Sequence, residues 1–354
     1  MKRTLLFMSL ILGLVVSAMV FVSCGDDEVE PNGGGNSGKN AEQNTTDVAV
    51  TGSVSEVGAF WAQINGVVNL EVITASYTNV TIGVEVSETE DFKNKKRIEA
   101  TDVVGRKFSV RASSLMPESK YYYRTYVKVS SLSYDYLGET YSFTTKKLPS
   151  VNGHYYVDLG LPSGTLWATM NVGATSPEGY GNYFAWGETE PYDENGKTTF
   201  NLGTYTLCNG SYDTLTKYCN SSSYGTVDNK TELDLEDDAA YVNWGKQWRM
   251  PSLEQFKELT NGSYTTTEWT SVNGVNGTLI TSKTNGNIIF LPAAGRRYDT
   301  SLYYAGSYGG YWSRTLYTDG PDRAWDLDFS SDGVRTYGSY RYYGQSVRPV
   351  RLSE

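Results

Sequence analysis

Among the side chains of this 354-residue sequence that can bind or react, tyrosine stands out with 29 copies, whereas histidine is scarce. Histidine occurs once, as His154. A single imidazole cannot build a His-based catalytic triad or a histidine metal cage. A phosphate-binding Gly-Lys-Ser loop is also absent from the sequence. We therefore predict no catalytic residue, no metal site and no cofactor.

Tyrosines are densest near the C-terminus, between residues 296 and 343, where Ser, Gly, Asp and Arg separate them. Tyrosine offers rigid amphipathic contact area at low entropic cost, and Arg and Trp are the other common anchors of binding surfaces. The predicted ligand-binding residues are Tyr298, Tyr303, Tyr304, Tyr308, Tyr317, Arg323, Trp325, Tyr337, Tyr340, Arg341, Tyr342 and Tyr343. Residues 337–343 are expected to be the most exposed, because glycines bracket this polar run. The alternative is that about half of these aromatic residues simply cover strands, since aromatics favour sheets.

Two cysteines, Cys208 and Cys219, lie close together in a stretch rich in Tyr, Ser and Asn that is typical of a loop. In an oxidising compartment we expect a local disulfide between them, which would add about 2–4 kcal/mol of stability. Two free buried thiols are the alternative.

Four acidic residues, Asp234, Glu236, Asp237 and Asp238, form a cluster that allows two interpretations. Their oxygens are the ligands that a hard cation prefers. Acidic residues also favour the start of a helix, where the helix dipole is positive. We prefer the helix start, and a helix over residues 236–244 is expected to follow.

The N-terminus has the pattern of a secretory signal, with a basic start, an apolar run at 5–22 and a small residue before a break. The junction at 21–24, Phe-Val-Ser-Cys, resembles that of bacterial lipoproteins. This resemblance implies that Cys24 is lipidated and becomes the mature N-terminus. An uncleaved anchor helix is the alternative, since about 20 apolar residues span a bilayer.

Residues 25–28, Gly-Asp-Asp-Glu, resemble the acidic tract that lipoproteins of the Bacteroides group use to reach the cell surface. We therefore expect a lipid-anchored protein of the outer membrane that faces the cell exterior, with a periplasmic orientation as the alternative. The net charge of −10 argues against nucleic acid as a partner.

Composition divides the chain into four parts. Residues 1–24 are the signal, and the Gly-rich residues 25–46 are expected to be a flexible tether. Residues 47–146 contain short alternating runs, at 59–64, 80–86, 108–110, 121–129 and 141–145, that predict the strands of a β-sandwich. Residues 150–354 are rich in Trp, Gly and Tyr, and the spacing of Leu253, Phe256 and Leu259 predicts a helix over 251–259.

The run LMPESKYYYR at 115–124 resembles the tyrosine corner of fibronectin type III domains. In that motif Pro117 turns the chain, while Tyr121 lays its ring on the core and hydrogen-bonds upstream backbone through its hydroxyl. The resemblance covers the whole segment 47–146. It implies an all-β sandwich that acts as a spacer, in which Trp61 belongs to the core.

A series of distinctive phrases follows in order, among them YVDLGLPSGTLWA at 156–168, YFAWGET at 183–189, WRMPS at 248–252, FLPAAG at 290–295 and SVRPV at 346–350. The series resembles the Fibrobacter succinogenes major paralogous domain over residues 152–352. That family is similar to the C-type lectin fold, including formylglycine-generating enzymes. The expected fold class is thus multidomain: an all-β fibronectin type III-like sandwich followed by an α+β C-type lectin-like domain rich in loops. Trp167, Trp186, Trp248 and Trp312 are expected in its core.

The chemistry of these relatives does not carry over. Formylglycine-generating enzymes use a cysteine pair near the C-terminus, and no cysteine follows Cys219 here. The run Gly320-Pro321-Asp322 departs from the Gln-Pro-Asp form of calcium-dependent lectins. We therefore expect neither oxidation chemistry nor calcium-dependent sugar binding.

What remains is a non-catalytic, adhesin-like surface lipoprotein. Its expected partner is a glycan or a protein on a host or neighbouring cell, bound through the C-terminal Tyr- and Arg-rich face. One alternative is a carboxylate-based enzyme acting on polysaccharide, which needs no histidine. Another is a structural or tip subunit of a surface assembly.

Overall fold

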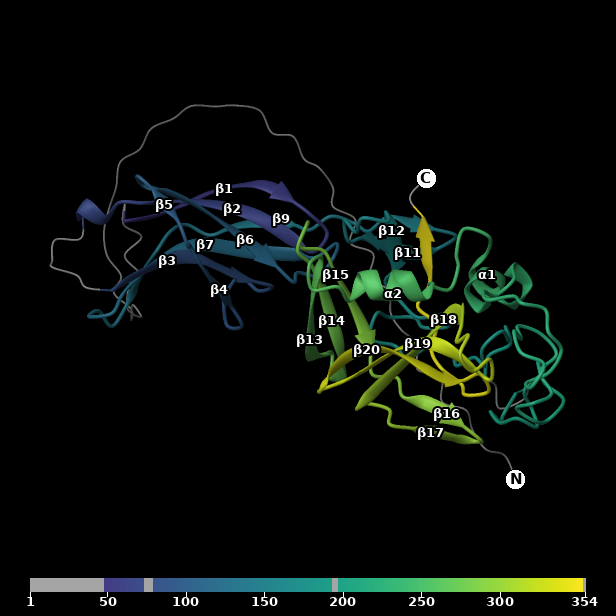
Figure 1. Ribbon diagram of the computed structural model, residues 1–354. Coiled ribbons are helices and arrows are strands. Elements are labelled where there is room, and N and C mark those ends of the chain that lie inside the picture. The colour runs from purple at the N-terminus through teal and green to yellow at the C-terminus, as the bar shows by residue number, and fades with distance from the viewer. Residues whose placement is uncertain (1–47, 73–78, 193–196, 353–354) are drawn as a thin grey trace, which may run out of the picture. The chain divides into compact units, whose positions relative to one another are not determined.

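The computed structural model describes residues 48–72, 79–192 and 197–352 (Figure 1). The predicted lipidation site Cys24, the signal and the tether lie outside the described residues, so they remain predictions from the sequence. Within the described ranges, no helix is long and apolar enough to cross a membrane.

Residues 49–144 form two facing antiparallel sheets. The first sheet has the order β1-β2-β6-β5 and the second the order β4-β3-β7-β8, with β9 also paired to β7. The strands of the first sheet are β1 (Ala49–Val57), β2 (Trp61–Val68), β5 (Val103–Val104) and β6 (Lys107–Ser113), and the 3-10 turn η1 (Leu70–Val72) follows β2. Those of the second are β3 (Val80–Ser87), β4 (Lys96–Glu99), β7 (Lys120–Val129), β8 (Asp135–Leu137) and β9 (Tyr141–Thr144).

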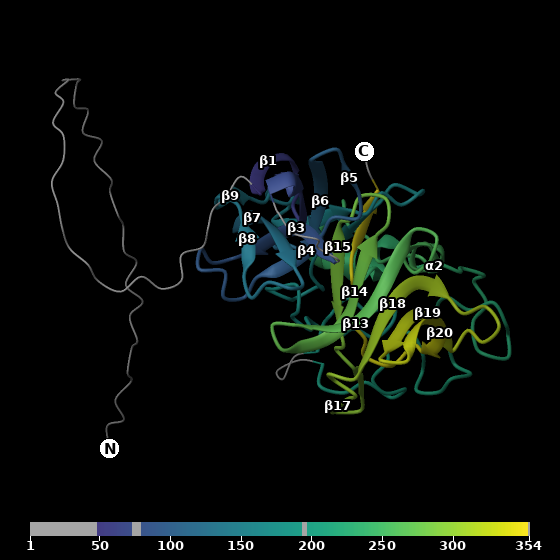
Figure 2. The ribbon, with the colours of Figure 1, turned by 90° about the vertical axis from the view of Figure 1, so that its left-hand side faces the viewer.

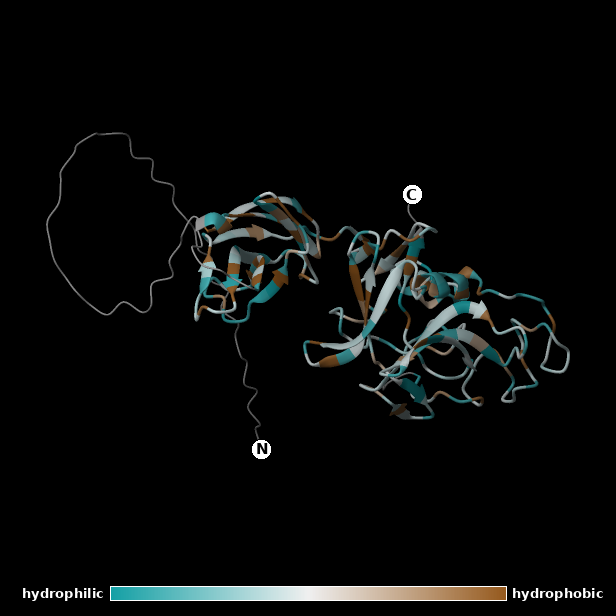
Figure 3. Ribbon diagram, turned by 60° about the vertical axis from the view of Figure 1, so that its left-hand side comes forward, coloured by the Kyte–Doolittle hydropathy of each residue, from teal (hydrophilic) through white to brown (hydrophobic). Residues whose placement is uncertain are grey.

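Alternating hydropathy builds this sandwich, as the alternation of colours along its strands in Figure 3 shows. In β2 the even-numbered positions from Ala62 to Val68 are buried, while the residues between them are half-buried. The inward side chains of both sheets, including Ile64, Val84 and Val127, meet in one core. All five strands predicted from the sequence are confirmed.

The tyrosine corner is also confirmed. The Tyr121 ring is buried in the core, and its hydroxyl accepts a hydrogen bond of 2.9 Å from the backbone N–H of Met116. Trp61 is different, because it is partly exposed and the Arg111 guanidinium lies 3.8 Å from its ring centroid. The expectation that Trp61 belongs to the core is therefore wrong.

Replacing Tyr121 with Phe removes that hydroxyl and leaves the Met116 N–H without it. We expect the free energy of unfolding to fall by about 1–1.5 kcal/mol, measured by urea denaturation. Tyr122→Phe is the matched control, since Tyr122 lies on the opposite side of β7 and is half-buried. Equal effects of the two substitutions would contradict the corner's role.

Residues 150–352 contain several small antiparallel sheets, which are joined by long irregular segments (Figure 2). One sheet consists of β10 (Ser150–Val151), β11 (His154–Asp158), β12 (Thr165–Ala168) and β21 (Val350–Leu352). A second consists of β13 (Thr265–Val272), β14 (Val275–Ser282) and β15 (Ile288–Pro292). The hairpin β16 (Arg296–Tyr298) and β17 (Ser301–Tyr303) precedes a third sheet of β18 (Tyr308–Leu316), β19 (Arg323–Ser330) and β20 (Gly333–Tyr340).

Both predicted helices are present, as α1 (Ala239–Trp244) and α2 (Leu253–Leu259). The 3-10 turn η2 (Leu235–Asp237) precedes α1. Ser252 starts α2 with a capping box, in which its hydroxyl accepts from the Gln255 N–H while the Gln255 side chain accepts from the Ser252 N–H. Leu253, Phe256 and Leu259 turn the predicted apolar face inward.

Large aromatic side chains fill the interior of this region. Trp167, Trp186, Trp248 and Trp312 are all fully buried, as predicted. The indole N–H of Trp186 donates to the Ser313 carbonyl at 2.7 Å, and that of Trp312 to the Phe184 carbonyl at 2.8 Å. The described residues thus form several mostly β sheets with little helix, including a fibronectin type III-like sandwich; the C-type lectin-like assignment stays a prediction.

Candidate functional site

A connected network of tyrosines lies where the β16–β17 hairpin meets the segment after β20. Backbone pairing between Arg297 and Gly344 joins these two parts. The Tyr298 ring lies 5.6 Å from Tyr343 and 6.1 Å from Tyr342, measured between centroids. Tyr303 and Tyr304 extend the network outward and are its most exposed rings, at 41% and 58%.

Arg296 lies at the centre of this network. Its guanidinium carbon is 4.7 Å from the Tyr343 ring centroid, 5.7 Å from that of Tyr304 and 6.0 Å from that of Tyr308. Arg296 is not among the binding residues predicted from the sequence. Its cation–π contacts stiffen the predicted rings, so that little side-chain freedom remains to be lost on binding.

Beside the network lies a pocket of about 300 Å³. Tyr340 and Tyr342 form one side, with their rings 5.4 Å apart and only 13° from parallel. Arg323 holds Tyr340 in place, because its guanidinium carbon lies 4.7 Å from the ring centroid and its Nη2 donates to the Tyr340 hydroxyl at 3.3 Å. The other lining residues are Leu202, Tyr205, Tyr212, Leu215, Tyr224, Asp322 and Arg341.

The part of the pocket wall that comes from residues 202–224 was missed by sequence reasoning. Tyr212 is well exposed at 56%, whereas Tyr205 is buried. The signal was present in the density of tyrosine in this irregular segment. Its proximity to Tyr340 depends on tertiary structure that no local pattern reveals.

Asp322 supplies a carboxylate to the pocket and is half-buried. Burial raises the pKa of this carboxyl, although the nearby Arg323 and Arg341 act in the opposite direction. A carboxylate beside aromatic rings is able to accept hydrogen bonds from the hydroxyl groups of a ligand.

Arg341 requires a correction, because the sequence placed it in direct contact with ligand. The side chain is 1% exposed, and its guanidinium donates four internal hydrogen bonds. Its Nε donates to the Tyr205 hydroxyl at 2.8 Å and its Nη1 to the Pro321 carbonyl at 2.9 Å. Arg341 therefore ties the separate walls of the pocket together instead of binding ligand.

Tyr317, Trp325 and Tyr337 lie outside both the pocket and the tyrosine network around Arg296. Tyr317 and Trp325 form a pair with ring centroids 4.7 Å apart. Tyr337 is exposed and packs against Arg335, whose guanidinium carbon is 5.3 Å from the ring. Tyr337 pairs with Asp326 and Tyr340 with Arg323, an odd number of positions apart, so Tyr337 and Tyr340 point to opposite faces of the sheet. The run 337–343 is thus less exposed than predicted.

The predicted disulfide between Cys208 and Cys219 is not formed, and both cysteines are free and buried. The Cys208 thiol donates to the Leu202 carbonyl at 3.3 Å, while the Cys219 thiol donates to the Ser221 carbonyl at 3.1 Å. Both side chains belong to the small apolar core behind the pocket. The alternative of two buried thiols is therefore the correct one.

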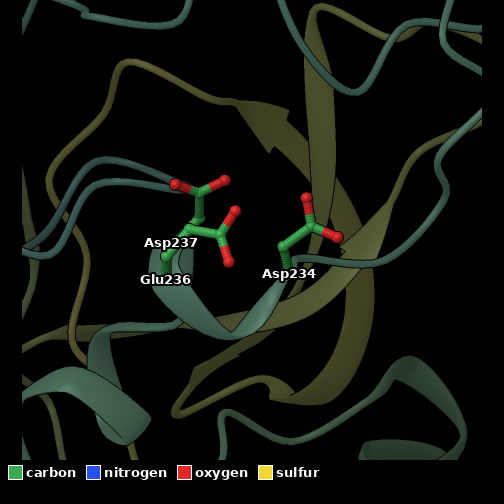
Figure 4. A group of neighbouring side chains, drawn as sticks. All are labelled: Asp234, Glu236 and Asp237. Atoms are coloured by element: carbon green, nitrogen blue, oxygen red, sulfur yellow. The ribbon is translucent and has the colours of Figure 1, made fainter.

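The acidic cluster surrounds a lysine. Figure 4 shows the carboxylates of Asp234, Glu236 and Asp237, which come from one turn of the chain. The Lys217 Nζ lies 2.8 Å from Asp234, 3.4 Å from Glu236 and 2.5 Å from Asp237. Hydrogen bonds from Lys217 and Lys230 lower the pKa of Asp234 to about 2. An ammonium group thus already compensates these charges.

Asp238 confirms the preferred interpretation of a helix start. It is fully buried, and its side chain accepts from the N–H groups of Ala240 and Tyr241 at the first turn of α1, each at 3.0 Å. The Arg249 Nε donates to the same carboxylate at 2.8 Å.

Comparison with known proteins gives limited similarity. A family model described as a domain of unknown function (DUF8237) matches residues 269–352. No curated protein matches the chain. The sensor domain of the anti-sigma factor RsgI4 in Pseudobacteroides cellulosolvens is 20% identical with a TM-score of 0.22, and the match covers 28% of this chain and 94% of that one. The fibronectin type III domain of human fibronectin type III domain containing protein 3 is 16% identical with a TM-score of 0.23, covering 30% and 91%.

Proposed function

We propose that this protein is a non-catalytic, lipid-anchored surface protein that binds a glycan in the pocket beside Tyr340 and Tyr342. The observation that carries the proposal is the pocket itself, in which a stacked tyrosine pair and the Asp322 carboxylate border about 300 Å³. This volume is at the small end of ligand pockets. It therefore suits the end of a saccharide chain.

The chemistry of the pocket favours sugar over other ligands. Sugar rings have apolar C–H faces that pack on aromatic rings, and hydroxyl edges that need hydrogen-bond partners. Tyr340 and Tyr342 offer ring surface, while Asp322 offers acceptor oxygens. Four of the five N–H groups of the buried Arg341 guanidinium donate to internal acceptors, and the side chain is 1% exposed. Anionic recognition by Arg341 is therefore not part of the proposal.

The rest of the chain fits a binding role at a surface. The fibronectin type III-like sandwich would act as a spacer, and an acylated Cys24 would hold the protein in the outer membrane. Each buried methylene of an acyl chain contributes about 0.8 kcal/mol to such anchoring. In this proposal residues 152–352 have the C-type lectin-like fold of the Fibrobacter succinogenes major paralogous domain, without its relatives' calcium or cysteine chemistry.

A protein ligand is the second candidate, because Tyr298, Leu302, Tyr303 and Tyr304 are all exposed on or next to the β16–β17 hairpin. Exposed tyrosines of this kind are common in protein-binding surfaces. A tip subunit of a surface assembly would use the same hairpin. Truncating Tyr303 and Tyr304 separates these possibilities from glycan binding, since neither residue lines the pocket.

A polysaccharide-active enzyme has less support. Glycosidase carboxyl groups stand about 5–9.5 Å apart across the scissile bond. In the buried pair Asp326 and Asp328, Asp326 is 0% exposed, so a saccharide does not reach both carboxyl groups. We therefore keep the non-catalytic proposal.

The proposal predicts that Tyr340→Ala weakens glycan binding about tenfold, the equivalent of about 1.4 kcal/mol of lost ring contact. The test is binding of the purified chain to a glycan array and to mucin, with and without chelator. Tyr337→Ala is the matched control, because Tyr337 is exposed on the opposite face of the sheet.

Thermal stability should change little in either variant, since both rings are partly or largely exposed. Equal binding by the wild-type protein and Tyr340→Ala would remove the pocket from the proposal. Absence of any glycan signal would contradict glycan binding and favour a protein ligand at the β16–β17 hairpin.

A further inference from the structure

Two buried carboxyl groups lie side by side behind the tyrosine network. Asp326 is 0% exposed and Asp328 is 5% exposed. They stand two positions apart on β19, so both side chains point to the same face of the sheet. Burial, followed by the charge of Asp328, raises the pKa of the Asp326 carboxyl.

The hydrogen-bond donors around this pair leave one carboxyl oxygen without a partner among the described residues. The Tyr308 hydroxyl donates to Asp328 Oδ1, and the Gln345 Nε2 donates to Asp326 Oδ2 at 2.8 Å. Asp326 Oδ1 is buried and has no hydrogen-bond donor within the described part of the chain. A carboxylate is acceptor-only, whereas a protonated carboxyl can donate. One proton on the pair supplies the missing donor.

A hard cation fits this position poorly. Calcium takes six to eight oxygen ligands and magnesium six in near-ideal geometry. Here Tyr308 and Gln345 both turn hydrogen-bond donors toward the carboxyl groups. These donors suit a pair that carries negative charge and holds a proton.

The surrounding charges favour one ionised carboxylate. On β20 the Arg335 Nη2 lies 3.8 Å from Asp328 Oδ2, and Arg296 on β16 acts on Asp328 from the hairpin side. Tyr308 faces the pair from β18, while Ser339 on β20 and Gln345 are its neutral partners. Tyr337 is the cross-strand partner of Asp326 on β20. Burial nevertheless raises the pKa of both carboxyl groups.

Solvent reaches this pair from one side. A cavity of about 250 Å³ is bordered by Tyr308, Asp328, Asp332 and Arg335. Protons can therefore exchange through Asp328, while Asp326 is enclosed behind it.

The pair supports the tyrosine network from behind. The Tyr308 ring, held by Asp328, lies 6.3 Å from Tyr304. Gln345, held by Asp326, follows Tyr343 by two residues and pairs its backbone with Phe184. A change at the carboxyl pair thus acts on both ends of the network.

We propose that Asp326 and Asp328 share one bound proton at neutral pH, and that this proton holds Tyr308 and Gln345, and with them the tyrosine network, in the binding arrangement. The effect on ligand rests on the proposed function, whereas the shared proton does not. Release of the proton at higher pH places two adjacent negative charges in the interior, which repel each other and loosen the network.

The expected pH dependence follows from linkage. The folded protein keeps a proton that an unfolded aspartate releases above about pH 4. Between that pH and the raised value of the pair, the folded state binds more protons than the unfolded state. The free energy of unfolding therefore decreases as pH rises through this window.

The test uses the whole chain and needs no ligand. Infrared spectra should show a protonated carboxyl at neutral pH in the wild type, which is lost in both Asp326→Asn and Asp328→Asn. Asp332→Asn is the control: it removes the same charge from an exposed residue beside the same cavity and should keep the protonated carboxyl. A wild-type spectrum without this signal would overturn the proposal, whether or not the variants fold.

Two further measurements separate the shared proton from its effect on the network. Urea unfolding at a series of pH values should show a slope in the wild type and Asp332→Asn that is flattened in Asp326→Asn, where the amide stands in for the protonated acid. The near-ultraviolet circular dichroism of tyrosine should change over the same window below about pH 9, where exposed tyrosines stay protonated. An unchanged slope in Asp326→Asn overturns the inference and leaves glycan binding at Tyr340 unaffected.

Discussion

Substituting Arg341 with Ala is expected to lower the free energy of unfolding by about 4 kcal/mol. The side chain is buried, and its removal leaves the carbonyls of Lys217, Tyr218 and Pro321 and the Tyr205 hydroxyl without their donor. Each unpaired buried polar group costs about 1–3 kcal/mol, and the vacated volume adds to this. The loss of stability should appear in urea denaturation followed by tryptophan fluorescence.

The same substitution should abolish binding in the pocket, because Arg341 joins residues 205–218 to residue 321. Arg341→Lys is an informative second variant. A lysine keeps the charge but lacks the planar fork that serves several acceptors at once, so most of the loss should remain. Lys246→Ala, which removes an exposed cation of the same region, should change stability by less than about 0.5 kcal/mol. A small effect of Arg341→Ala would contradict the buried position of this side chain and favour the exposed position predicted from the sequence.

Substituting Glu85 with Ala is expected to destabilise the sandwich by about 3 kcal/mol. Glu85 is fully buried on β3, and its direct cross-strand partners are Arg97 on β4 and Arg124 on β7. Its oxygens lie 2.7 Å from Arg97, 2.9 Å from Arg124 and 2.8 Å from Lys95. Removing one member of a buried ionic group leaves the others uncompensated, which typically costs 3–5 kcal/mol; the partial exposure of the three cations places Glu85 at the lower end.

The pH dependence of this effect has a definite sign. Burial alone would raise the pKa of Glu85, but hydrogen bonds from Lys95, Arg97 and Arg124 outweigh it and the pKa is lowered. The stabilisation is therefore complete above the ordinary glutamate pKa of about 4.3, and is lost as pH falls below that value through the lowered one. Thermal unfolding of the wild type and Glu85→Gln should converge at acid pH. Glu99→Gln, an exposed glutamate on β4, should show no such convergence.

The strands of the sandwich could be predicted because their signal is local. Alternation of apolar residues marks β2, β3 and β7, and the spacing of Leu115, Pro117 and Tyr121 marks the tyrosine corner. The start of α2 is similarly visible in the spacing of Ser252 and Gln255. Each of these features depends on residues that are close together in the sequence.

The errors concern side chains whose surroundings come from distant segments. Cys208 and Cys219 are close in sequence, but each thiol faces a carbonyl of its own neighbourhood. Arg341 stands in a polar run that looks exposed, yet its partners lie more than a hundred residues upstream and at residue 321. Asp326 and Asp328 were not recognised at all, because nothing in their sequence context shows that the sheet encloses them.

The pocket is lined by two parts of the chain that differ in how regular their structure is. Tyr340 ends β20 and Asp322 directly precedes β19, whereas Tyr212 and Tyr224 belong to an irregular segment whose backbone accepts hydrogen bonds from Arg341 at residues 217 and 218. In the proposed function, exchanging the residue at 212, which is 56% exposed, would alter which ligand fits while the strands keep their pairing. Recognition by the proposed pocket would then be open to change by point substitution at this position, with one scaffold retained.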